Sequence, residues 1–155
     1  LGAFESFFAG RGHAVGLRKQ VAGVAKRGFP PVPPPVLALL ALEAATGVLM
    51  GVQDADAIRE HVTLDVLPSP GSFVGMRGDA VECAAGELVV RDTDGVIASV
   101  FQGPDKRTAV GPASKNLLFY VFDSHPSLGP DHAEAVDAVV SLVSGSATTT
   151  TVAGS

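Results

Sequence analysis

Apolar residues form one long run in the first third of the chain, and this run predicts a helix. Residues 36–45 place apolar side chains on every side of a helix, and Pro35 suits its first turn. A helix that is apolar on every side is expected to be buried on every side, so this should be the central helix of the domain. Gly47 loosens its end, and Asp54 can cap a second helix over residues 54–62.

Beyond a loop rich in Pro and Ser at residues 67–72, the pattern becomes that of β-strands. The turn at residues 92–95 has hairpin chemistry, because Asp and Gly tolerate the positive φ that a tight reversal needs. Residues 117–122 are apolar or aromatic without alternation, which predicts a strand covered on both faces near the middle of a sheet. The other strands are predicted over residues 73–76, 79–83, 87–91 and 96–101.

A last helix is predicted over residues 131–144, with valines on one stripe and acidic residues in its early turns. Residues 146–155 form a Thr-rich tail without a periodicity of its own. The order of helices, antiparallel strands and a helix predicts the α+β class, with the first helix packed against the sheet.

Length and composition are those of a single globular domain. The chain has 155 residues, of which 46% are hydrophobic and 17% are charged. Its one cysteine, Cys83, excludes an internal disulfide framework and a multi-cysteine metal cluster. The most apolar run, residues 36–50, contains Glu43 and is shorter than the roughly 20 residues that cross a bilayer, so no membrane partner is expected. The chain has no glycine-rich phosphate loop, and we predict no cofactor.

Residues 1–30 differ in charge from the rest of the chain. They carry five basic residues against Glu5, whereas the remainder is acidic, and the formal net charge is -5. The phenylalanines of this basic arm are poorly suited to a solvated tail. We therefore expect the arm to dock on a neighbouring protein subunit, with nucleic-acid binding as the weaker alternative. The residues predicted to bind the partner are Phe4, Phe7, Phe8, Arg11, Arg18, Lys19, Lys26 and Arg27.

A proline-rich stretch at residues 31–35 separates the arm from a body that covers residues 36–145. Prolines fix φ and remove amide donors, so they favour an extended segment. A stiff spacer is the favoured interpretation, and a proline-rich ligand for another domain is the alternative.

The residues with the most chemistry follow the apolar strand at 117–122. Asp123 and His125 are two residues apart, which places both side chains on the same side of a strand end. The carboxylate could then orient the imidazole as a general base, or both groups could simply satisfy loop amides. The same two residues with Asp131 and His132 would form a tetrahedral metal site only if all four converge, and we predict no metal site.

The segment 119–126 is similar to a strand-end motif, an apolar residue followed by Phe-Asp-x-His, of the papain-like cysteine protease domain in herpesvirus large tegument proteins. The likeness covers residues 34–144 as an outline of helices and strands, and residues 119–126 as a motif. It implies a papain-like fold, in which a buried N-terminal helix packs on an antiparallel sheet, and an activity that removes ubiquitin.

At the nucleophile position that the resemblance implies, this sequence departs from the family. Residues 32–37 contain no Cys, Ser or Thr, and proline has neither a nucleophilic atom nor an amide for an oxyanion. The resemblance therefore implies a protease that has lost its nucleophile. Cys83 could replace it, but the adjacent Glu82 should raise the thiol pKa, which favours a buried structural thiol.

These observations support three hypotheses. The first is a non-catalytic assembly protein, with a degenerate papain-like body and an arm that docks on neighbouring subunits in a virus particle. The second is an active cysteine hydrolase or deubiquitinase, which would use Cys83, His125 and Asp123 and bind a ubiquitin-like protein. The third is nucleic-acid binding through the arm. A viral origin would place the protein in the virion or the host cytoplasm.

Overall fold

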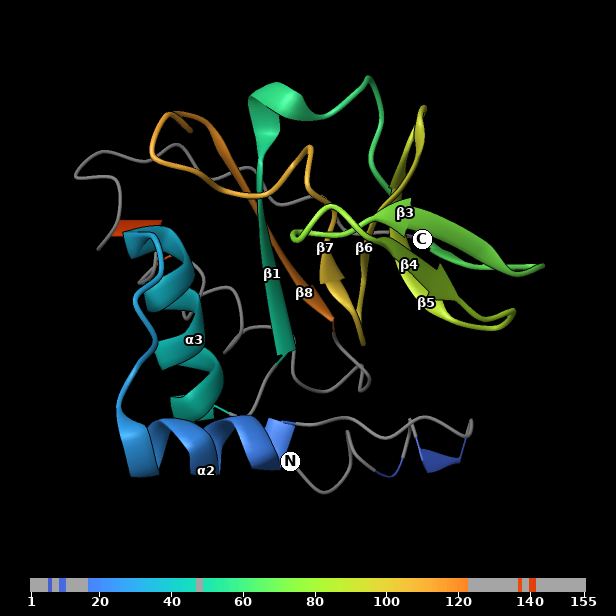
Figure 1. Ribbon diagram of the computed structural model, residues 1–155. Helices are drawn as coiled ribbons and strands as arrows, with labels where there is room; N and C mark the ends of the chain where they lie inside the picture. Colours follow the sequence, from blue (N-terminus) through green and yellow to red (C-terminus); the bar gives the residue numbers. More distant parts are fainter. Residues whose placement is uncertain are drawn as a thin grey trace. The chain divides into compact units, whose positions relative to one another are not determined.

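The computed structural model describes residues 6, 9–10, 17–46, 49–122, 137 and 140–141 (Figure 1). The chain divides into two compact units. We call Leu1–Leu49 with Asp123–Ser155 the terminal unit, and Met50–Phe122 the central unit. Most of the helix predicted over 131–144 and all of the predicted tail lie outside the described residues.

Two helices are described in the terminal unit. Helix α2 covers Leu17–Arg27, and helix α3 covers Pro34–Thr46. Helix α3 begins with two prolines, which fits a first turn that needs no amide donors. Along α3, Leu39 and Glu43 are buried one turn apart, whereas Leu37 is exposed. Because Leu37 is exposed, the predicted burial of this helix on every side is not confirmed.

The central unit is built from short strands in three sheets. One sheet pairs β1 with β8, a second has the order β2-β5-β6-β7, and a third pairs β3 with β4. The pairings of β2 with β5, β5 with β6, β6 with β7 and β3 with β4 are antiparallel. The strands are β1 (Leu49–Asp54), β2 (Thr63–Val66), β3 (Gly71–Val74), β4 (Ala80–Cys83), β5 (Leu88–Asp92), β6 (Gly95–Ser99), β7 (Gly103–Pro104) and β8 (Leu117–Phe122). A mixed α and β chain with antiparallel sheets is thus confirmed.

The predicted hairpin between β5 and β6 is confirmed. Asp92 pairs with Gly95, whose φ of 132° lies in the region that favours glycine. The carboxylate of Asp92 accepts a hydrogen bond from the Asp94 amide at 3.0 Å, which closes the turn. A register irregularity follows at Val90 and Arg91.

Part of the core of the central unit is a cluster of buried apolar side chains between the strands. Leu67, Phe73, Cys83 and Val89 form this cluster, and Val81 and Val96 pack against it. Since these residues lie on or beside β3, β4, β5 and β6, the cluster packs the β3–β4 hairpin against the β5–β6 hairpin.

The prediction of a second helix over residues 54–62 was wrong. Strand β1 continues to Asp54, which caps only a three-residue turn, η1 (Ala55–Ala57). Ile58 has extended backbone angles, φ -72° and ψ 142°, and so ends that turn. The β-branched residues that follow favour strand β2 over a helix.

The position predicted for residues 117–122 was also wrong. These residues form β8, as predicted, but β8 pairs with β1 in a two-stranded sheet among the described residues. Five of its six residues are only half-buried. An apolar run without alternation indicated burial, and it did not indicate how many strands lie beside it.

Candidate functional site

The predicted catalytic pair, Asp123 and His125, lies outside the described residues. The strand that precedes the pair ends at Phe122, which is buried. Asp131 and His132, the other members of the alternative metal site, also lie outside the described residues. The proposed roles of these four residues therefore stay predictions.

The predicted arm is described only in part. Arg18 and Lys19 lie in α2, and Lys26 and Arg27 are exposed in its last turn, where cations favour the helix dipole. The remaining residues predicted to bind a partner, Phe4, Phe7, Phe8 and Arg11, lie outside the described residues.

Cys83 is a buried thiol at the end of β4. Its side chain belongs to the core cluster, and the residue is 2% exposed. Burial raises the pKa of the thiol to about 11, and the carboxylates of Glu87 and Glu82 add to that rise. At neutral pH the group is therefore protonated, and the thiolate that a nucleophile needs is almost absent.

Cys83 should resist alkylation in the folded protein. Iodoacetamide at neutral pH should leave the mass of the protein unchanged in native buffer, because the thiol is both buried and protonated. The same reagent should modify the residue fully in a strong denaturant, which serves as the control. Rapid modification in native buffer, or covalent capture by a ubiquitin-based probe, would instead support the hydrolase hypothesis.

A buried polar cluster of Glu87 and Ser99 lies beside Cys83. The carboxylate of Glu87 accepts the Ala84 amide at 2.9 Å and the Ser99 hydroxyl. Ser99 Oγ in turn accepts the amides of Phe101 at 3.0 Å and Gln102 at 3.2 Å. A serine beside a carboxylate resembles part of a catalytic set, but here each group satisfies a turn of the backbone.

Another polar cluster centres on Asp92, whose side chain is fully buried. Its Oδ2 accepts the Arg59 amide at 2.9 Å and Arg107 Nη2 at 2.8 Å. Arg107 Nη1 also donates to the Ala57 carbonyl at 2.7 Å, and its Nε lies 3.7 Å from Asp105 Oδ2. Arg107 thus joins η1, the β5–β6 hairpin and the segment after β7.

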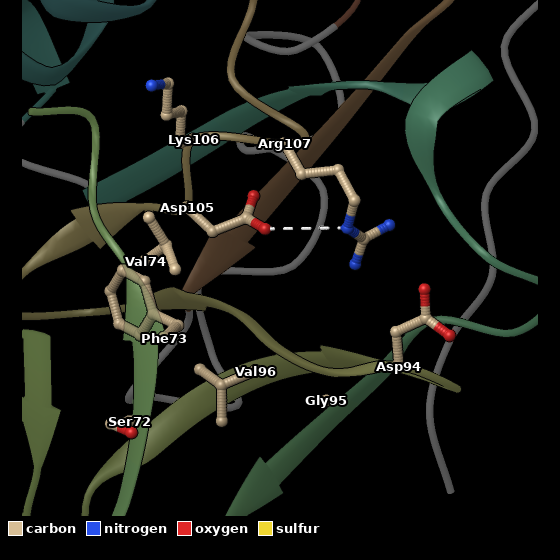
Figure 2. Close-up of a pocket in the computed structure, with 9 residues that line it drawn as sticks. All are labelled: Ser72, Phe73, Val74, Asp94, Gly95, Val96, Asp105, Lys106 and Arg107. Atoms are coloured by element: carbon tan, nitrogen blue, oxygen red, sulfur yellow. Dashed lines mark ion pairs between the residues drawn. The ribbon is translucent and has the colours of Figure 1, made fainter. Parts of the chain in front are cut away.

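A hollow of about 460 Å³ opens next to this cluster in the central unit (Figure 2). The segment that carries its charges is held between two strands, because the Asp105 amide donates to Ile97 O and the Lys106 amide donates to Val74 O, both at 2.8 Å. Figure 2 shows apolar side chains on one side of the hollow and the Asp105–Arg107 ion pair on another. The lining residues are Ser72, Phe73, Val74, Asp94, Gly95, Val96, Asp105, Lys106 and Arg107.

The charged groups that line this hollow already form hydrogen bonds and ion pairs within the protein, which limits the chemistry available there. Arg107 directs all three of its nitrogens toward protein oxygens, and Asp105 Oδ1 accepts the amide and hydroxyl of Thr108. In the part of the chain that the structure describes, no group of three or more His, Cys, Asp or Glu could hold a metal ion. Within the same residues, no helix is long and apolar enough to cross a membrane.

Exposed apolar side chains are the feature that the sequence reasoning missed. Val62, just before β2, is 41% exposed, and Leu64 and Val66 within β2 are 53% and 54% exposed. Val74 in β3 and Met76 after it are also exposed. The alternation of apolar and polar residues over 62–66 was the available signal, but the helix predicted over 54–62 obscured it.

In comparisons with known proteins, no family model and no curated protein matches the chain.

Proposed function

We propose that this protein is a non-catalytic assembly module, which binds neighbouring copies through its surface instead of transforming a substrate. The supporting observation is a row of exposed apolar side chains, formed by Val62 just before β2 and by Leu64 and Val66 within it. We call this row the β2 stripe. Contiguous apolar surface on a soluble domain is characteristic of protein contact sites, because covering it removes apolar area from water.

The polar groups of the central unit give independent support for this function. Cys83 is buried and protonated, and Glu87 and Ser99 bind each other and nearby backbone amides. Asp92 and Arg107 join separate segments of the fold. Such groups are already occupied by structural contacts, whereas a catalytic group needs access to a substrate.

The finer features of the proposal come from the sequence. The motif at residues 119–126 supports a papain-like body with a buried N-terminal helix and a viral setting. The prolines at 33–35 support the loss of the nucleophile. The basic arm would add a second contact to a neighbouring subunit, and the exposed Lys26 and Arg27 suit an acidic surface.

Sedimentation velocity of the intact chain tests the proposed function. We expect the average mass to rise with protein concentration, because association covers apolar side chains that the single chain leaves in water. The rise should persist at high salt if apolar contacts dominate. A single monomeric species throughout a wide range of concentrations would overturn the proposal.

A further inference from the structure

Strand β2 has a free edge among the described residues. It is the outermost strand of the order β2-β5-β6-β7, and its only described neighbour is β5. The edge carries no Lys and no Pro within Thr63–Val66, and no register shift interrupts its pairing with β5. Lys and Pro residues and β-bulges are among the devices that protect an edge strand from pairing with another chain.

The backbone groups on that edge belong to the residues of the β2 stripe. The Leu67 amide donates to the Glu87 carbonyl at 3.0 Å, so Leu67 directs its backbone toward β5. Alternation along an antiparallel strand then directs Asp65 and Thr63 toward β5 as well. Leu64 and Val66 therefore present their N–H and C=O groups at the free edge.

We propose that a second copy of the chain adds its own β2 antiparallel to this edge, about a two-fold axis through Leu64. This inference rests on the proposed function and names its contact surface. With the axis at Leu64, the two Leu64 residues face each other, and Val62 of each copy faces Val66 of the other. All members of the β2 stripe then share one face of a continuous sheet, which any register shifted by one residue would prevent.

Charge complementarity on the opposite face favours the same register. Thr63 is paired with Arg91 within one copy, and the axis at Leu64 places Asp65 of the second copy opposite Thr63. Each Asp65 carboxylate thus lies in the same cross-strand row as Arg91 of the other copy. Within one copy, Arg91 Nη1 already donates to Asp65 Oδ2 at 3.0 Å. The Arg91 side chain is 41% exposed, so part of its guanidinium is accessible to a second carboxylate.

Cysteine crosslinking tests this register in the full chain. In the proposed dimer the two Leu64 Cα atoms lie about 5.5 Å apart, which suits a disulfide, so Leu64→Cys should form a crosslinked dimer under mild oxidation. Thr63→Cys is the matched control, because its two Cα atoms are separated by more than the roughly 7 Å that a disulfide spans. The unsubstituted chain should give no crosslink, since Cys83 is buried.

Crosslinking of Leu64→Cys with loss of crosslinking in Thr63→Cys supports the proposal. Equal crosslinking of both variants, or none in Leu64→Cys while the unsubstituted chain still associates, overturns it and leaves the proposed function standing. A chain that stays monomeric in sedimentation overturns the proposed function itself. Because Leu64 is exposed, the cysteine should not disturb the fold, and circular dichroism of each variant checks this.

Discussion

Asp92→Ala should lower the free energy of unfolding by about 3 kcal/mol, the usual cost of removing one partner from a buried, hydrogen-bonded charge pair. The substitution leaves Arg107 without its closest carboxylate and removes the acceptor of the Arg59 and Asp94 amides. Chemical denaturation measures the loss. A loss no larger than that of a surface substitution would contradict the role assigned to Asp92.

Asp94→Ala is the matched control for this experiment, since both carboxylates belong to the same hairpin. Asp94 pairs with Arg59 at 3.7 Å, but the two side chains are 58% and 62% exposed. Exposed pairs contribute little, so the expected cost is below about 1 kcal/mol.

The contribution of Asp92 should also depend on pH. Burial acts to raise the pKa of this carboxyl, but hydrogen bonds from the Arg59 amide, Arg107 and the Asp94 amide outweigh burial and hold the pKa below its ordinary value. A lowered pKa in the folded state gives stability that is complete above the unfolded pKa of about 4 and is lost as pH falls through the folded value. The difference between the unsubstituted chain and Asp92→Ala should therefore shrink in acid and stay constant near neutrality.

Gly51→Ala should destabilise the protein by about 2 kcal/mol through overpacking. A Cβ on Gly51 would overlap the Tyr120 ring, so the ring or a strand must move. The ring also packs edge-on against Phe122 at 5.2 Å between centroids, which restricts its retreat. Thermal or chemical denaturation measures the effect, and an unchanged stability would contradict this packing.

Two further variants separate this clash from the general effect of adding a methyl group to glycine. Gly111→Ala should be close to neutral, because nothing lies within 4 Å of a Cβ at that position. In the double variant Gly51→Ala with Tyr120→Ala, the two losses should be less than additive, since removal of the ring also removes the clash.

The sequence predicted those elements whose signals are local. The hairpin at 92–95 and strand β8 follow from turn chemistry and apolar residues that need no knowledge of distant partners. The helix predicted over 54–62 failed because Asp54 does act as a cap, yet cap chemistry serves a three-residue turn as well as a long helix. Tertiary pairing of β2 with β5 decided the conformation of the residues that follow.

The candidate sites were harder to predict for the same reason. The burial of Cys83 and the rise of its pKa agree with its strand context and with the adjacent Glu82. The contacts of Arg107 with Asp92 and Ala57 join residues far apart in the chain, and no local pattern announces them. The β2 stripe likewise suggests a contact site only because β2 is the outermost described strand of its sheet. The order of strands in a sheet depends on pairing between distant residues, which the local sequence does not indicate.

Association through the β2 stripe is most directly tested by sedimentation velocity of the intact chain beside its Leu64→Arg variant. The account predicts that the unsubstituted chain forms a dimer as concentration rises, whereas the variant stays monomeric because the new cation at the axis would face its own copy. Two samples that are both monomeric at every concentration, or that dimerise equally, would contradict it.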